Sequence, residues 1–274
     1  MMKILLLILF TMNANAMTLT TENIVVRVTF LNGGKEYKVN GLIVKPENAK
    51  RKLPLVILTH GAPGEARDRK NYVPEMYLPQ AKAIAALGYM VASIERRGFG
   101  RSAEPFMESP GSCKHRSYMM SAEKTSEDIS GAFNYLKKRS DVDPSRIVIA
   151  GQSAGGFVMT QFARRNPPGL RGVISFAGGR GSDGHGKVCD LEQLNSVYAE
   201  SGRDTKVPEL WVYADNDKSF GPYFKKWFQL YTASGKATLF EVPSFGDDGH
   251  HLFSAKGIPI WIDHVSDFLK SVMK

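Results

Sequence analysis

RIVIAGQSAGG, residues 146–156, joins a short β-branched run to a G-x-S-x-G pentapeptide. Residues 146–150 predict a buried strand, and residues 154–165 predict a helix. A serine between the two lies on a tight turn that exposes its hydroxyl at the carboxyl end of a sheet. A turn that merely packs a helix on a strand is the alternative interpretation. We predict that Ser153 is a nucleophile and that the N–H of Ala154 faces a developing oxyanion.

HGAPG at residues 60–64 follows another strand-like run, LPLVILT at residues 53–59. An oxyanion hole needs a second N–H donor from a separate loop. Ala62 is the candidate, because it directly follows a flexible glycine. A tight Gly/Pro turn is the alternative. His60 precedes the serine in the chain, so we expect a structural hydrogen-bonding residue rather than the base.

Two polar clusters, DND at residues 215–217 and GHH at residues 249–251, come soon after strand-like runs. Parallel α/β sheets bind their ligands at the carboxyl ends of their strands. A serine hydroxyl needs a base, and the base needs a carboxylate that holds its tautomer. We predict Asp217 as the acid, in preference to Asp215, and His250 as the base, in preference to His251. A polar turn and an exposed loop are the alternatives for these clusters.

Strand-like and helix-like segments alternate after an opening β-hairpin at residues 23–31 and 37–45. Further strands are expected at residues 53–59, 89–94, 146–150, 172–177, 209–214 and 238–242, and helices at residues 79–87, 121–138, 154–165, 191–200, 223–233 and 261–272. This alternation is typical of an α/β fold with a mostly parallel central sheet and helices on both faces. No repeat or composition break occurs, so we predict a single domain over residues 17–274.

The first residues, MMKILLLILFTMNANAM, have the three parts of a secretory signal peptide. These parts are Lys3, the apolar run at residues 4–10 and the small-x-small site that ends at Ala16. The run is too short for a membrane anchor, and the polar residues after it argue against a buried helix. We expect a signal peptide at residues 1–16, cleavage after Ala16, a periplasmic or secreted protein and no integral membrane association.

The formal net charge is +9, and there are two cysteines, Cys113 and Cys189. A basic balance can attract nucleic acid, but there is no run of five or more like charges. A solvated basic surface without a nucleic-acid partner is therefore the preferred interpretation. In an oxidising compartment the cysteines are expected to form a disulfide, with two separate thiols as the alternative. Two cysteines are too few for a metal site, and no cofactor is expected.

These residues resemble the α/β-hydrolases of the dienelactone-hydrolase-like group, which neighbour the prolyl-oligopeptidase-like hydrolases. The matching stretches are HGAPG at 60–64, ERRGFGRS at 95–102, DPSRIVIAGQSAGG at 143–156, YADND at 213–217 and GHHLF at 249–253. They follow the family's order over nearly all of the chain after the leader. The resemblance implies the α/β-hydrolase fold, a serine esterase, Asp217 as acid, His250 as base, and a structural role for residues 95–102. True dienelactone hydrolases have a cysteine nucleophile where this chain has Ser153.

The predicted chemistry is acyl transfer through an acyl-enzyme, without a metal or organic cofactor. Small carboxylic esters are the expected substrates, and the alternative is a serine peptidase that acts on short peptides. A third possibility is a catalytically silent binding protein, which the loss of a triad position would indicate.

The long connections at residues 97–120 and 178–190 are expected to line the substrate pocket, because long loops in such sheets often bind ligands. Phe99, Phe106 and Phe220 are candidates for its apolar walls. A bond between Cys113 and Cys189 would tie these two loops together.

Overall fold

A computed structural model describes residues 17–29, 36–102 and 104–274. The predicted signal peptide at residues 1–16 and the turn of the predicted hairpin at residues 32–34 lie outside the described residues.

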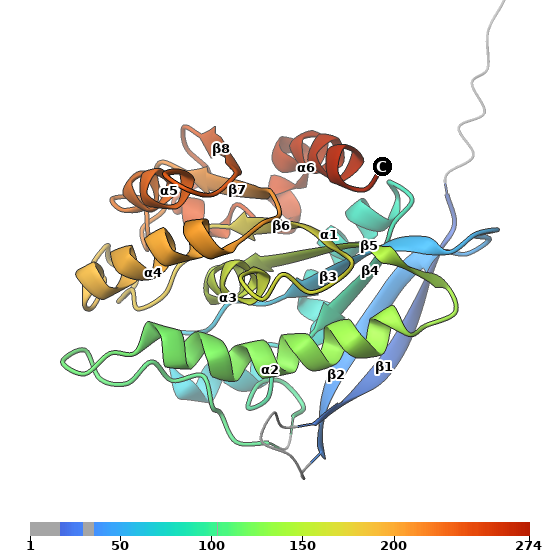
Figure 1. Ribbon diagram of the computed structural model, residues 1–274, viewed down its shortest axis with the longest axis horizontal. Coiled ribbons are helices and arrows are strands. Elements are labelled where there is room, and N and C mark those ends of the chain that lie inside the picture. The colour runs from blue at the N-terminus through green and yellow to red at the C-terminus, as the bar shows by residue number, and fades with distance from the viewer. Residues whose placement is uncertain (1–16, 30–35, 103) are drawn as a thin grey trace, which may run out of the picture.

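A single mixed sheet of eight strands runs through the described part of the chain, in the order β1-β2-β4-β3-β5-β6-β7-β8 (Figure 1). The strands are β1 (Leu19–Thr29), β2 (Glu36–Pro46), β3 (Leu53–Thr59), β4 (Met90–Ile94), β5 (Val142–Gln152), β6 (Leu170–Phe176), β7 (Glu209–Ala214) and β8 (Ala237–Val242). The pairs β1–β2 and β2–β4 are antiparallel, and the pairs from β4 to β8 are parallel. The sheet therefore brings the carboxyl ends of β3, β5, β7 and β8 to the same edge.

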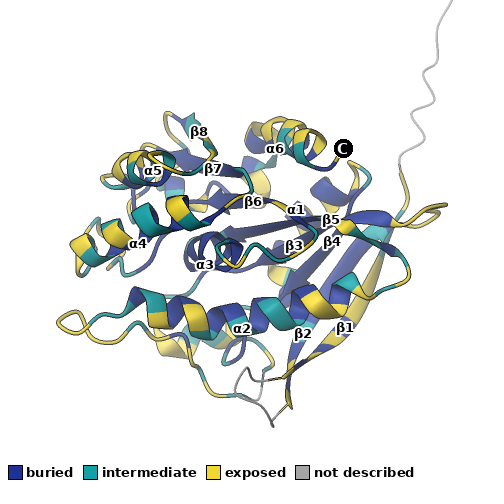
Figure 2. Ribbon diagram, viewed as in Figure 1, coloured by how far each residue is buried: buried dark blue, intermediate teal, exposed yellow. Residues whose placement is uncertain are grey.

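Helices cover both faces of this sheet (Figure 1). They are α1 (Leu78–Ala85), α2 (Tyr118–Lys137), α3 (Ala154–Ala163), α4 (Leu191–Asp204), α5 (Phe224–Thr232) and α6 (Ile258–Val272), with short 3-10 helices η1 (Ala66–Asn71), η2 (Pro74–Tyr77), η3 (Gly249–His251) and η4 (Ala255–Gly257). Side chains of α1 and α6 pack on one face, and side chains of α2 to α5 pack on the other. The central strands are thus buried on both sides, as Figure 2 shows by their dark colour.

Burial on both faces explains why β3 reads as a continuous apolar run. Leu55 and Ile57 point into the core under α2 and α3, whereas Val56 and Leu58 point into the core under α1 and α6. Successive side chains of a strand face opposite sides, so a strand covered on both faces needs apolar residues throughout. The predicted α/β architecture is confirmed.

Some element ends differ from the sequence prediction. The last helix begins at Ile258 rather than at residue 261, with Pro259 in its first turn. Proline is tolerated there because its missing N–H would have no partner within the helix. The helix predicted to begin at residue 121 begins at Tyr118, where the Ser117 side chain accepts a hydrogen bond from the backbone N–H of Met120. A serine at this position caps a helix N-terminus.

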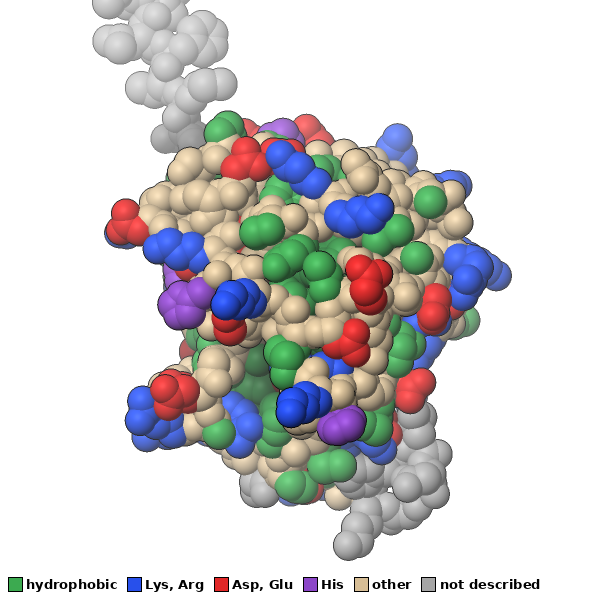
Figure 3. Space-filling view, turned by 90° about the vertical axis from the view of Figure 1, so that its left-hand side faces the viewer, with side chains coloured by type: hydrophobic (Ala, Val, Ile, Leu, Met, Phe, Trp, Pro, Cys, Tyr) green, Lys and Arg blue, Asp and Glu red, His purple; other side chains and the backbone are tan. Residues whose placement is uncertain are grey.

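The surface carries charges of both signs. On the face shown in Figure 3, hydrophobic side chains gather near the centre, and Lys, Arg, Asp and Glu side chains are interspersed around them. This face has no broad patch of a single sign, although the formal net charge of the chain is +9. None of the helices in the described ranges is long and apolar enough to cross a membrane.

Cys113 and Cys189 form a disulfide, with 5.2 Å between their Cα atoms. The two cysteines are 76 positions apart in the sequence. Their bond joins the segment before α2 to the segment after β6. The expectation that the two long connections are cross-linked is thus met.

Reduction of this disulfide is expected to lower stability by roughly 2–4 kcal/mol, because the open loop gains conformational entropy in the unfolded state. For a chain of this length that loss corresponds to a fall in Tm of about 5–15 °C. Calorimetry with and without reductant measures it, and the double variant Cys113→Ser/Cys189→Ser serves as a control that reductant should not affect. An unchanged Tm and unchanged kinetics in reductant would contradict this expectation.

Candidate active site

Ser153 lies on a sharp turn between β5 and α3, with φ 56° and ψ −123°. A positive φ is unfavourable for a residue with a side chain and persists only where the surroundings impose it. Here the turn is possible because its neighbours lack side chains: a Cβ on Gly155 would lie 2.4 Å from the backbone oxygen of His60. A Cβ on Gly151 would lie 2.4 Å from the carbonyl carbon of Gly155. These glycines explain the G-x-S-x-G pattern as a requirement for close backbone approach.

The structure brings Ser153, His250 and Asp217 together. The Ser153 hydroxyl lies 3.0 Å from His250 Nε2, and His250 Nδ1 lies 3.1 Å from both carboxylate oxygens of Asp217. Ser153 follows β5, Asp217 lies in the turn after β7, and His250 lies on η3 after β8. The distances fit a histidine whose Nδ1–H donates to the carboxylate and whose Nε2 accepts from the serine hydroxyl.

Asp217 is held rigidly below the histidine. Its side chain is fully buried, and its Oδ1 accepts hydrogen bonds from the backbone N–H groups of Ser219 (2.7 Å) and Phe220 (2.9 Å). The backbone N–H of His250 donates to Asp248 Oδ1 at 2.9 Å. Backbone groups thus orient the Asp217 carboxylate and hold the backbone of His250 beside it.

The alternative residues for the acid and the base lie elsewhere. Asp215 forms an ion pair with Lys225 at 3.1 Å on the surface, and a hydrogen bond with the Glu241 side chain, followed by that with Lys225, lowers the pKa of Asp215. His251 is exposed at the rim of the cavity beside Ser153. Of these two carboxylates and two histidines, Asp217 and His250 are the pair that the structure places within hydrogen-bond distance of each other, with His250 also beside Ser153.

The loop after β3 lies directly over the Ser153 turn. Ala62 and Ser153 line the same cavity, and a Cβ on Gly61 would lie 3.1 Å from Ser153 Cβ. Ala154 is the first residue of α3. The two predicted oxyanion donors thus flank the serine from two separate segments.

His60 has the structural role that its position in the chain suggested. Its Nδ1 lies 2.7 Å from the carbonyl oxygen of Gly61, and its Nε2 accepts the backbone N–H of Arg96 at 3.2 Å. Burial, followed by the positive charge of Arg96, holds the pKa of His60 well below its usual range. A neutral ring with the proton on Nδ1 satisfies both contacts.

A cavity of about 390 Å³ opens beside Ser153. Its lining residues come mainly from η2, α1 and the segment around η3: Ala62, Tyr72, Met76, Tyr77, Pro79, Gln80, Gln152, Ser153, His250, His251, Phe253, Ser254 and Ala255. Most of this wall is aromatic or aliphatic.

The prediction that the long loops line this cavity is wrong: no described residue of 97–120 or 178–190 does so. Phe99 packs on the ring of His60 at 4.6 Å, and Phe106 packs on Phe99 at 5.5 Å. Phe220 supports His250 from below, with 5.4 Å between the ring centroids. The two loops are joined to each other by the disulfide.

Sequence reasoning missed the segment at residues 72–80 as the cavity wall. The signal that could have found it is the stretch YVPEMYLPQ, which has two tyrosines and a methionine and runs from the segment after the HGAPG loop into α1. It contains prolines at positions 74 and 79, so it cannot be a single regular helix, and its large side chains must pack in another way.

No group of His, Cys, Asp or Glu side chains in the described ranges could hold a metal ion.

Comparison with known proteins agrees with this architecture. A family model described as serine aminopeptidase, S33, matches residues 55–184. Acylamino-acid-releasing enzyme 1 of Oryza sativa subsp. japonica is 23% identical over 195 residues, which are 71% of this chain and 19% of the rice protein. The chain spans 19%, 47% and 55% of the lengths of three curated relatives.

Two solved structures illustrate the shared fold. The Pyrococcus furiosus esterase Pf2001 superposes with a TM-score of 0.65 at 14% identity, over 92% of this chain and 94% of the esterase. The Pyrococcus horikoshii acylaminoacyl peptidase superposes with a TM-score of 0.68 at 16% identity, over 93% of this chain and 42% of the peptidase. Together with the sheet order and the strand–turn–helix at Ser153, these superpositions show that the chain has the α/β-hydrolase fold.

Proposed function

We propose that the protein is a secreted serine esterase with Ser153 as nucleophile, His250 as general base and Asp217 as the carboxylate that orients His250. The observation that carries the proposal is the chain of hydrogen bonds from the Ser153 hydroxyl through His250 to the buried Asp217, at 3.0 and 3.1 Å. It lies at the mouth of a cavity large enough for a small substrate.

The reaction proceeds through an acyl-enzyme. His250 Nε2 takes the proton of Ser153 as Oγ attacks the ester carbonyl carbon, and the N–H groups of Ala62 and Ala154 stabilise the oxyanion. The bond to the leaving alcohol breaks, and the alcohol takes the proton from His250. Water then gives a proton to His250 and attacks the acyl group, and the acid leaves as Ser153 regains its proton.

The lining of the cavity favours an uncharged acyl group. Among the described residues that line it there is no Asp, Glu, Lys or Arg, and Tyr72, Tyr77 and Phe253 form aromatic walls. An aminopeptidase must bind the α-ammonium group of its substrate, and an unpaired charge in such a cavity is costly. A neutral acyl group of a few carbons avoids that cost.

A second candidate is a peptidase that acts on substrates with a blocked amino terminus. The observation that favours it is the likeness to an acylamino-acid-releasing enzyme and to an acylaminoacyl peptidase. A blocked terminus carries no charge, so it is compatible with the same neutral cavity.

Export is part of the proposal and rests on two features. The leader at residues 1–16 has the composition of a signal peptide. The disulfide between Cys113 and Cys189 is of a kind that persists in oxidising compartments.

A substrate panel tests the proposal. We expect p-nitrophenyl acetate and butyrate to be hydrolysed, and the p-nitrophenyl hemiester of succinate, which has the same chain length with a carboxylate, to show kcat/KM lower by about tenfold or more. N-acetylalanine p-nitroanilide and alanine p-nitroanilide form the second matched pair. Turnover of the acetylated anilide in preference to both esters would favour the peptidase, and preferential turnover of the free alanine anilide would contradict the neutral cavity.

A further inference from the structure

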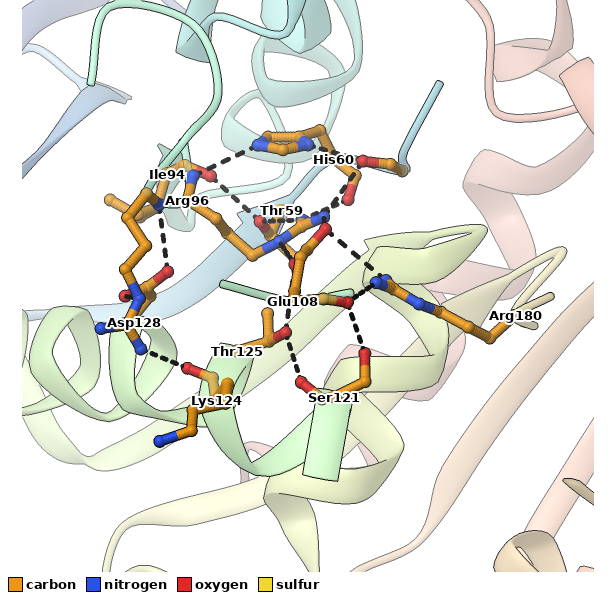
Figure 4. A network of polar contacts seen from close by, with 12 residues as sticks. Thr59, His60, Ile94, Arg96, Glu108, Ser121, Lys124, Thr125, Asp128 and Arg180 are labelled. Carbon is orange, nitrogen blue, oxygen red and sulfur yellow. Dashed lines mark hydrogen bonds and ion pairs between the residues drawn. The ribbon is translucent and has the colours of Figure 1, made fainter. Parts of the chain in front are cut away.

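The loop that carries Ala62 is held by one buried arginine. Arg96 Nη1 donates to Thr59 Oγ1 at 2.9 Å and also to the carbonyl oxygen of His60, while its Nη2 donates to the carbonyl oxygen of Gly61 at 3.1 Å. Arg96 is completely buried. Figure 4 shows the guanidinium group lying under the backbone of this loop. Arg96 therefore contacts three consecutive residues immediately before Ala62.

The contact with Gly61 controls the direction of the Ala62 N–H. The carbonyl of Gly61 and the N–H of Ala62 belong to one planar trans peptide unit, in which they point in opposite directions. The Gly61 oxygen receives Arg96 Nη2 at 3.1 Å and His60 Nδ1 at 2.7 Å. With this oxygen held against Arg96, the Ala62 N–H points away from the guanidinium, and Ala62 lines the same cavity as Ser153.

Glu108 orients Arg96 in turn. Its carboxylate accepts Arg96 Nε at 2.8 Å on Oε2 and Arg96 Nη2 at 3.1 Å on Oε1, a two-point contact that fixes the plane of the guanidinium. Thr125 Oγ1 also donates to Oε2, at 3.1 Å. Burial raises the pKa of Glu108, but the charges of Arg96 and Arg180 outweigh that effect and lower it to about 2. Glu108 is therefore ionised at neutral pH.

The segments around Glu108 are fastened on several sides. The carbonyl oxygen of Glu108 accepts the hydroxyl of Ser121 at 2.6 Å and a guanidinium N–H of Arg180, as Figure 4 shows. Arg180 follows β6 in the segment joined to Cys113 by the disulfide of Cys189. In the same segment, the backbone N–H of Gly179 donates to the carbonyl oxygen of Ser153 at 3.2 Å. One buried assembly thus touches the Ala62 loop and the serine turn.

We propose that Glu108, acting through Arg96, is a positioning residue that aims the Ala62 N–H at the oxyanion formed at Ser153. Stability alone does not account for this arrangement, because buried ion pairs often stabilise a fold no better than apolar side chains of the same volume. What the ion pair supplies is a fixed direction for two carbonyl groups. The inference rests on the proposed esterase function.

Glu108→Gln tests the proposal, with Glu127→Gln as the matched control. Glu127 also pairs with a buried arginine, Arg97, but on α2 and away from residues 60–62. For p-nitrophenyl butyrate we expect Glu108→Gln to lower kcat by about 10- to 100-fold with KM within about twofold, because removal of one oxyanion donor costs about 10²–10³-fold in kcat. The Ki of a trifluoromethyl ketone, which forms a tetrahedral adduct with the serine, should rise in proportion. Glu127→Gln should keep kcat within about twofold of the unchanged protein.

Equal kcat values in Glu108→Gln and Glu127→Gln, or a lower kcat with an unchanged Ki of the ketone, would overturn the proposal. If Glu108→Gln does not fold, Glu108→Asp keeps the charge, and its shorter side chain should lower kcat about tenfold.

If the unchanged protein cleaves no ester, the esterase proposal fails, and the rate at which a fluorophosphonate labels Ser153 then tests the positioning role. We expect labelling about tenfold slower in Glu108→Gln, and equal rates would overturn it. Absence of both turnover and labelling in the unchanged protein overturns both proposals.

Discussion

Replacement of Ser153 by alanine is expected to lower kcat for p-nitrophenyl butyrate by about 10⁵–10⁶-fold, the loss seen when a triad nucleophile is removed. The hydroxyl oxygen is the atom that forms the acyl-enzyme in the proposed reaction, and its O–H donates to His250 Nε2, 3.0 Å away. The backbone at φ 56° accommodates alanine as it does serine, so Tm should change by less than about 2 °C. Steady-state kinetics and fluorophosphonate labelling measure the loss.

Ser254→Ala is the matched control for Ser153→Ala. Ser254 lines the same cavity, and its hydroxyl has no part in the hydrogen bonds that join Ser153, His250 and Asp217. We expect kcat within about threefold of the unchanged protein, since the change removes a polar group from the wall and no reacting atom. Activity of Ser153→Ala above about 1% of the unchanged protein would mean that another residue is the nucleophile.

Asp217→Asn is expected to lower kcat by about 10⁴-fold, as a neutral amide in place of the triad carboxylate does elsewhere. The asparagine oxygen can still accept the backbone N–H groups of Ser219 and Phe220, which lie 2.7 and 2.9 Å from Oδ1 of Asp217. Its NH₂ group then faces His250 Nδ1, so the ring must place its proton on Nε2 and can no longer accept from Ser153. The loss should appear in kcat and kcat/KM alike, because the interaction is needed only during proton transfer.

Asp215→Asn tests which of the two neighbouring aspartates, Asp215 or Asp217, acts as the carboxylate that orients His250. Asp215 is exposed and pairs with Lys225 at 3.1 Å, and exposed ion pairs contribute little. We expect kcat within about twofold of the unchanged protein and a nearly unchanged Tm. A larger loss in Asp215→Asn than in Asp217→Asn would show that the acid has been assigned to the wrong carboxylate.

Local sequence patterns determined most of the architecture. A strand buried on both faces is mostly apolar, so the apolar runs within β3, β5 and β7 could be recognised without a structure. The serine turn could also be recognised from the sequence. The close approach of Gly151 and Gly155 excludes side chains at both positions, so the turn requires glycines there. Requirements of this kind act between residues a few positions apart, and the sequence therefore records them directly.

Tertiary structure alone decided which polar residues meet. Asp215 and Asp217 are two residues apart and chemically identical, yet the turn after β7 buries Asp217 and leaves Asp215 at the surface. The hydrogen bond between Ser153 and His250 joins residues 97 positions apart. The direction of a side chain at the end of a strand depends on the turn that follows. A polar turn sequence is compatible with several turn conformations.

The walls of the cavity and the support of the loop that carries Ala62 were also decided by tertiary packing. Residues 97–120 looked like a pocket lining because they form a long connection, but they do not line the cavity; the disulfide and the bonds of Glu108 to Arg96 tie them to other segments instead. A single glutamate in a loop predicts a solvent-exposed side chain. Its burial is possible only because guanidinium groups from other segments compensate its charge. The sequence by itself therefore determined the sheet, the helices and the serine turn. The pairing of Asp217 with His250, the cavity beside Ser153 and the buried ion pair arose instead from contacts between distant segments, because no local pattern specifies which segments meet.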